Sequence, residues 1–122
     1  MTPELLAEQI AVQAAEKKAH DILELDLRGV VGYTDFFVIC SGNSDRQVTA
    51  IHDGILEALK AEHGIFPRRV EGLSQAHWVL MDYLDVLVHI FTPQTREFYR
   101  LESLWGEAGV RKLPQAAEVV SG

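Results

Sequence analysis

The chain has 122 residues, the length of a single domain, and its 48% hydrophobic and 24% charged residues are typical of a globular protein. Its single cysteine, Cys40, excludes an internal disulfide and a zinc site with two thiolates, and no apolar run reaches the length of a membrane span. A formal net charge of −7 disfavours a nucleic-acid-binding domain, which is usually basic, and favours a basic protein surface as partner. The N-terminus is acidic and lacks the basic start of a secretory signal, so we expect a reduced protein of the cytoplasm.

The first predicted elements are a helix and a strand. Thr2 is a suitable N-cap for a helix that runs to about Ala19, with apolar residues spaced by four along one side. In Ile22–Leu27 the period changes to two, so that the leucines share one face while Glu24 and Asp26 lie on the other. This alternation predicts a strand with one face in water.

A buried strand and a second helix follow. Phe36–Cys40 is a continuous apolar run, which is typical of a central strand covered on both faces, and we expect Cys40 to be a core residue. Ser44 and Gln47 form a capping box for a helix that Gly64 ends. A helix in this place can connect two parallel strands.

The next region is rich in predicted strands. We expect a short strand at Arg69–Glu71, and we expect Trp78–Asp82 and Val86–Phe91 to pair across a tight turn at Tyr83–Asp85. Because Val86–Phe91 is apolar almost throughout, it is predicted to be a second central strand.

A third helix is predicted to begin at Thr92. Its core-facing stripe consists of Phe98, Leu101 and Trp105, and Gly106 is expected to close it. The residues after it show no clear period, which favours a loose C-terminal tail.

Together these elements predict an α/β (α+β) fold with a mixed β-sheet flanked by helices. Residues 1–108 are expected to form one domain, and residues 109–122 are expected to form the tail.

The residues offer no convincing catalytic set. The turn Ser41–Ser44 presents backbone N–H groups at a helix start, which suits an anion, but it matches no phosphate-binding fingerprint and an ordinary capped helix start is the simpler interpretation. Asp82 and Asp85 form the most suggestive carboxylate pair for metal ions, yet a turn separates them and both can simply flank the hairpin. His89, within an apolar strand, is expected to be a core or interface histidine. We therefore assign no catalytic, cofactor-binding or metal-binding residue.

Three segments resemble a known family. They are Asp35–Gln47 (DFFVICSGNSDRQ), Trp78–Phe91 (WVLMDYLDVLVHIF) and Arg96–Ala108 (REFYRLESLWGEA), with Val70-Glu71-Gly72 between the first two. The combination strongly resembles the ribosomal silencing factor family, also called Iojap or RsfS, over nearly the whole chain up to about Ala108. Two positions depart from the family pattern, because Leu84 stands where glycine is typical and Phe36 stands where tyrosine is usual.

The resemblance implies a fold similar to that of nucleotidyltransferases, without known catalysis. It also implies binding to the large ribosomal subunit through ribosomal protein fourteen, which prevents joining of the small subunit and silences translation when nutrients are short. Direct contact with nucleic acid is expected to be slight, no membrane is involved, and family members are reported to form homodimers.

The same resemblance points to a partner-binding surface on the Trp78–Asp85 segment and the final helix. The candidate residues are Trp78, Leu80, Asp82, Tyr83, Leu84, Asp85, Tyr99 and Glu102. Trp78, Leu80 and Asp82 alternate onto one face, where they form either an exposed anchor with its carboxylate or a core pair with Asp82 alone exposed.

Leu84 at the hairpin tip predicts either a widened turn or a strained one, and either a contact with a partner or second copy or a fold-back onto its own hairpin. The rival function is a nucleotidyltransferase-like enzyme that uses Ser41-Gly42-Asn43-Ser44 for phosphate and Asp82 with Asp85 for metal.

Overall fold

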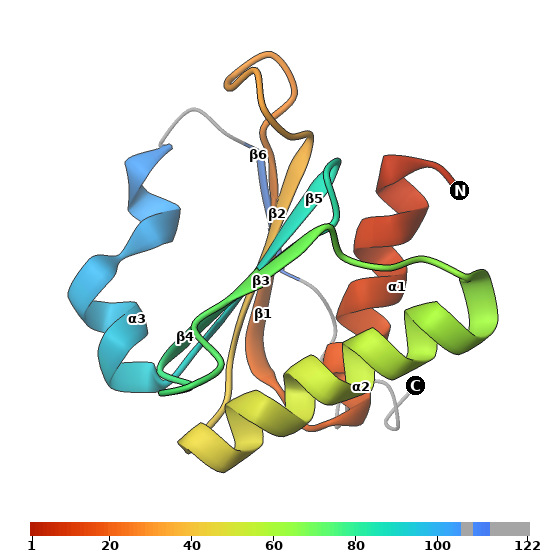
Figure 1. Ribbon diagram of the computed structural model, residues 1–122. Coiled ribbons are helices and arrows are strands. Elements are labelled where there is room, and N and C mark those ends of the chain that lie inside the picture. The colour runs from red at the N-terminus through yellow and green to blue at the C-terminus, as the bar shows by residue number, and fades with distance from the viewer. Residues whose placement is uncertain (106–108, 113–122) are drawn as a thin grey trace, which may run out of the picture.

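The computed structural model describes residues 1–105 and 109–112, which form one mixed sheet with helices on both sides. In chain order the elements are α1 (Pro3–Glu16), β1 (His20–Asp26), β2 (Phe36–Ser41), α2 (Asp45–His63), β3 (Arg69–Glu71), β4 (Trp78–Asp82), β5 (Val86–Phe91), α3 (Pro93–Tyr99), the 3₁₀ helix η1 (Leu101–Leu104) and β6 (Gly109–Lys112). Figure 1 shows α1 and α2 on one side of the sheet and α3 on the other. The predicted α+β fold with a mixed sheet is confirmed.

The six strands lie in the order β3-β4-β5-β2-β1-β6. Among the described strands, β2 and β5 are the one parallel pair, and all other neighbours are antiparallel. Every residue of β2 and of β5 is buried, which confirms both as central strands. The chain passes from β2 to β5 through α2, β3 and β4, so α2 belongs to the expected connection between parallel strands.

The predicted helix boundaries rest on local capping. Thr2 accepts a hydrogen bond from the backbone of Leu5 at 3.1 Å, and Ser44 accepts one from the backbone of Gln47 at 3.1 Å. Gly64 ends α2 in the left-handed conformation, with φ of 63°. These interactions involve residues no more than a few positions apart, so sequence alone is enough to predict them.

Two apolar cores lie on the two sides of the sheet. The larger one packs α1 and α2 against the strands and includes Ile10, Ile51 and Ile55, all fully buried. The smaller one contains Phe37, Phe91 and their neighbours. Cys40 belongs to the larger core, and burial raises the pKa of its thiol to about 12, which confirms it as an inert core residue.

The third helix differs from its prediction. It ends at Tyr99 because Arg100 adopts a left-handed conformation with φ of 46°, and a separate 3₁₀ turn follows. The break rotates the apolar positions apart, so that Leu101 is buried but Phe98 is 78% exposed instead of facing the core. The expected end at Gly106 lies outside the described residues.

The start of the predicted tail is also different. Gly109–Lys112 forms β6, which pairs with β1 along the edge of the sheet. Arg111 of this strand donates a 2.9 Å hydrogen bond to Glu24, so Glu24 is buried although β1 was expected to keep its acidic side in water. The rest of the predicted tail, residues 113–122, lies outside the described residues. None of the helices in the described part of the chain is long and apolar enough to cross a membrane.

Candidate functional site

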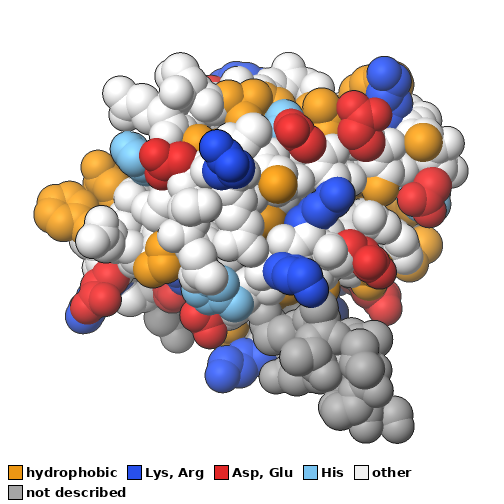
Figure 2. Space-filling model, turned by 90° about the horizontal axis from the view of Figure 1, so that it is seen from below, with side chains coloured by type: hydrophobic (Ala, Val, Ile, Leu, Met, Phe, Trp, Pro, Cys, Tyr) orange, Lys and Arg blue, Asp and Glu red, His pale blue; other side chains and the backbone are white. Residues whose placement is uncertain are grey.

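The side of the sheet that carries α3 is only partly covered, and we call it the α3 face. Its buried residues are Leu25, Leu27, Phe37, Ile39, Leu87, Phe91 and Leu101, and Leu23, Val31, Trp78, Leu80 and Trp105 pack around them half-buried. α3 itself contributes no buried residue, and Phe98, Tyr99 and Leu104 stand exposed next to this core. In Figure 2, which views the molecule from below, apolar side chains project on the side where α3 lies, and charges of both signs are scattered over the surface.

Trp78 lies at the centre of an aromatic cluster on this face. Its ring centroid is 4.9 Å from that of Phe91 and 4.9 Å from that of Tyr99. Its indole Nε1 donates a 3.0 Å hydrogen bond to Nδ1 of His89. Leu80 points to the same side of β4, because side chains two residues apart share a face. The structure therefore brings Trp78, Leu80 and Tyr99 together in one partly exposed apolar patch.

A hollow of about 320 Å³ opens beside this patch, lined by Trp78 and Tyr99 and by a polar rim of Gly72, Ser74, Gln75, His77 and Thr95. Gly72 has a φ of 90°, and a Cβ atom there would lie 2.1 Å from the carbonyl oxygen of Trp78. Only glycine fits this close approach, which keeps the rim packed against the backbone of Trp78.

Asp82 departs from its expected exposure. It is only 2% exposed, and its Oδ1 accepts a hydrogen bond from the backbone N–H of Leu84 at 2.8 Å. The guanidinium groups of Arg68 and Arg69 lie 3.1 and 3.6 Å from its carboxylate oxygens. Both arginine side chains are exposed at the surface, and they are the ion partners of this buried group. The carboxylate of Asp82 is therefore buried and paired within the hairpin region, and it is not exposed as expected.

The hairpin tip is strained, as one of the two predicted outcomes required. Leu84 has a φ of 74° and is 50% exposed, and the backbone N–H of Asp85 bonds to the carbonyl oxygen of Tyr83 at 2.9 Å. Tyr83 is buried on the opposite side of the sheet, in the core under α1 and α2, and this burial raises the pKa of its hydroxyl. Leu84 and Asp85 thus form the exposed tip, and Tyr83 does not.

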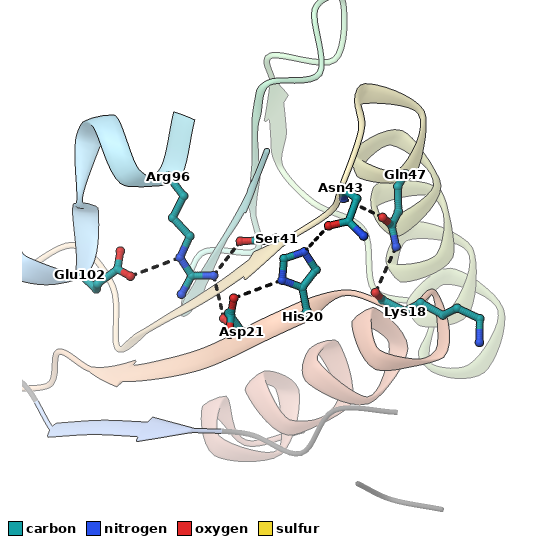
Figure 3. Close-up of polar contacts among 8 residues, drawn as sticks. All are labelled: Lys18, His20, Asp21, Ser41, Asn43, Gln47, Arg96 and Glu102. Carbon is teal, nitrogen blue, oxygen red and sulfur yellow. Dashed lines mark hydrogen bonds and ion pairs between the residues drawn. The ribbon is translucent and has the colours of Figure 1, made fainter. Parts of the chain in front are cut away.

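Glu102 lies in a different polar cluster, shown in Figure 3. Its carboxylate accepts a 3.2 Å hydrogen bond from Nε of Arg96, whose Nη1 donates to the backbone oxygen of Asp21 and to the hydroxyl of Ser41. A hollow of about 410 Å³ lies beside these residues. Sequence reasoning missed Arg96, because its partners are 55 and 75 positions away along the chain.

The residues of the rival enzymatic site do not converge. Ser41 of β2 lies opposite Phe91 at one end of β5, whereas Asp82 of β4 lies opposite Leu87 near the other end. At about 3.3 Å per strand residue, the two are separated by roughly 13 Å or more. The described residues include no group of three or more His, Cys, Asp or Glu side chains that could hold a metal ion. The Ser41–Ser44 turn acts as a helix cap, in which Gln47 bonds to the backbone of Asn43 at 2.6 Å.

The described residues thus define a small α+β domain with a mixed sheet and one face kept partly open by a short, weakly buried helix. Residues 1–121 match the family model described as "Ribosomal silencing factor during starvation". The chain belongs to this family, as the sequence resemblance indicated.

Relatives and solved structures agree with this assignment. The chain is 47% identical to "Ribosomal silencing factor RsfS" of Halalkalibacterium halodurans, over 82% of this chain and 86% of that protein. It is 38% identical to "Protein Iojap, chloroplastic" of Zea mays, over 88% of this chain and 46% of that longer protein. A crystal structure of a Chromobacterium violaceum protein superposes with a TM-score of 0.84 at 30% identity, covering 97% of this chain and 98% of the other.

Proposed function

We propose that this protein binds the large ribosomal subunit through ribosomal protein fourteen, blocks its association with the small subunit and so represses translation when nutrients are limited. This activity would take place in the cytoplasm and would require no catalysis by the protein. Family membership provides the ribosomal context, since the relatives are named ribosomal silencing factors. The location of the proposed binding site is supported by the apolar patch of Trp78, Leu80 and Tyr99 on the α3 face.

This patch has the composition of a protein-binding surface. Tryptophan and tyrosine are enriched among residues that dominate binding energy, and such residues cluster where water can be excluded. Exposed Phe98 extends the patch along α3, and Leu104 extends it along η1. The patch is apolar rather than basic, so it suits a protein surface better than a phosphate backbone.

Charge supports the choice of a basic partner. The chain carries 18 acidic and 11 basic residues, and ribosomal proteins that contact RNA are rich in Lys and Arg. Asp85, exposed at the hairpin tip, is suited to steer such a partner, whereas the carboxylates of Asp82 and Glu102 are already engaged within the chain. Rim charges of this kind mainly change the association rate and its salt dependence.

The proposed mechanism is steric. A domain of this size seated on the joining surface of the large subunit excludes the small subunit without chemistry, so repression should scale with occupancy. Incorporation of labelled nucleotide by the purified protein in the presence of divalent metal would instead favour the rival enzyme.

Co-sedimentation with purified subunits and intact ribosomes tests the proposal. We expect the protein to sediment with large subunits, and neither with small subunits nor with intact ribosomes. Trp78→Ala should weaken this binding at least 30-fold, because anchors of this kind contribute about 2 kcal/mol or more. Phe66→Ala is the matched control, since Phe66 is 61% exposed in the loop between α2 and β3, away from the α3 face. Equal loss in both variants, or in neither, would move the interface elsewhere.

A further inference from the structure

We infer that His89 is a positioning residue for partner binding: its Nδ1 fixes the indole of Trp78 so that the aromatic anchor meets the partner as a purely apolar surface. This inference rests on the proposed function, because it assumes that Trp78 contacts the partner. It assigns a role to a buried polar side chain in the middle of an otherwise apolar strand.

His89 is enclosed by aromatic rings and strand neighbours. It is 6% exposed, and in the sheet it lies between Leu80 of β4 and Ile39 of β2. Its ring centroid is 4.6 Å from that of Phe37 and 6.2 Å from that of Phe91, to which it is nearly parallel. These contacts fix the plane of the imidazole before any partner binds.

The hydrogen bond with Trp78 defines the state of the imidazole. An indole N–H only donates, so Nδ1 of His89 must accept, and the ring proton of the neutral imidazole then resides on Nε2. Burial lowers the pKa of His89 to about 4, which keeps the ring neutral and Nδ1 able to accept at physiological pH. Nε2 has no hydrogen-bond partner among the described residues, so the bond from Trp78 is the side-chain hydrogen bond that His89 makes there.

The consequence for Trp78 concerns both orientation and water. A half-buried tryptophan whose N–H faced outward would have to find an acceptor on the partner or lose a hydrogen bond with water, at a cost. Here the N–H is satisfied inside the chain, and the ring rests against Phe91 and Tyr99. The partner surface opposite Trp78 therefore needs apolar side chains and no hydrogen-bond acceptor.

A pair of variants separates positioning from simple packing. His89→Leu removes the acceptor and keeps an apolar side chain, whereas His89→Gln retains an amide oxygen that can accept from Trp78. We expect His89→Leu to weaken binding to large subunits about tenfold, the effect of one lost hydrogen bond at most, and His89→Gln to recover part of that loss. Retention of full affinity by a folded His89→Leu variant would overturn the inference.

Nuclear magnetic resonance of the free protein tests for the hydrogen bond between Trp78 and His89 in the absence of the ribosome. The indole N–H resonance of Trp78, assigned by its loss in Trp78→Phe, should exchange slowly with water in the parent chain and in His89→Gln. In His89→Leu it should exchange fast. Fast exchange in the parent would overturn the inference, whatever the binding data show.

A double-mutant cycle completes the test. Trp78→Phe removes the donor and keeps an aromatic ring, so adding His89→Leu to it should change affinity less than twofold. An additive tenfold loss would show that His89 acts through packing alone and would contradict the inference. If Trp78→Ala leaves binding unchanged, the proposed function loses its site, while the exchange experiment still decides whether His89 holds the indole.

Discussion

The two faces of the sheet are covered to very different extents. On one face α1 and α2 bury a continuous apolar stripe of alanines, leucines and isoleucines. On the other, α3 buries none of its residues, is only seven residues long and is attached through Arg96 and ring contacts. The first face holds the larger of the two apolar cores, and the second leaves aromatic surface exposed. Substitutions on the two faces should therefore separate stability from binding.

The largest expected effect is on stability, from the covered face. Ile55→Ala, at a fully buried position of α2, should lower the free energy of unfolding by about 3 kcal/mol and leave the affinity of the folded protein unchanged. Leu80→Ala on the α3 face should cost about 1 kcal/mol of stability but weaken large-subunit binding tenfold or more. Urea denaturation and co-sedimentation measure the two quantities. Similar profiles for both variants would remove the distinction between the faces.

Acid should destabilise the α3 face through His89. Burial lowers the pKa of His89 from 6.5 to about 4, so between these values the unfolded chain binds a proton that the folded chain does not. Stability should thus rise with pH from about 4 to 6.5 and level off above, with a total contribution of about 3 kcal/mol. Unfolding free energies measured across this range should have a smaller slope in His89→Leu. An unchanged slope would mean that His89 is not the group that titrates.

The two hairpin aspartates should behave in opposite ways. Asp82→Asn removes the charge that pairs with Arg68 and Arg69, and should cost about 2 kcal/mol of stability. Asp85→Lys lies at an exposed position, so it should leave stability within about 0.5 kcal/mol and slow association with the large subunit. Denaturation and stopped-flow binding at two salt concentrations distinguish them. Loss of stability in Asp85→Lys, or of binding alone in Asp82→Asn, would reverse these roles.

The smallest effect on stability is expected at Leu84. A leucine at φ of 74° is strained by about 1 kcal/mol, which glycine relieves, while half of the side chain is already exposed. Leu84→Gly should leave the melting temperature unchanged or slightly raised, and it should weaken self-association or ribosome binding if this side chain contacts a partner. Calorimetry and analytical ultracentrifugation provide the readouts. A lower melting temperature with normal assembly would identify Leu84 as a packed residue of its own domain.

Local patterns were sufficient to predict much of the fold. The caps at Thr2 and Ser44 and the apolar runs of β2 and β5 all depend on residues that are close in the chain. For the turn at Leu84 the sequence left open whether it is widened or strained, and the φ of 74° decides for strain. The alternation along one strand placed Trp78 and Leu80 on the same face, but it left open whether that face is exposed or belongs to the core.

The remaining features depend on distant partners. Glu24 is buried beside β6, where it bonds to Arg111, a residue 87 positions further along the chain. Arg96 is held by hydrogen bonds to Ser41 and to the backbone of Asp21. The helix breaks at Arg100, and no glycine or proline stands there as a sequence signal for the break. The sequence therefore predicted one continuous helix with a single apolar stripe. Aspartate is usually exposed, and the burial of Asp82 is explained by its ion pairs with Arg68 and Arg69 at β3.

The most direct test measures subunit association itself. Light scattering should follow the joining of purified large and small subunits while the protein is titrated to saturation, with Trp78→Ala and Phe66→Ala as the two variants. The parent and Phe66→Ala should reduce association in proportion to occupancy of the large subunit, and Trp78→Ala should not do so at the same concentrations. Undiminished association at full occupancy by the parent would contradict a steric block by the α3 face.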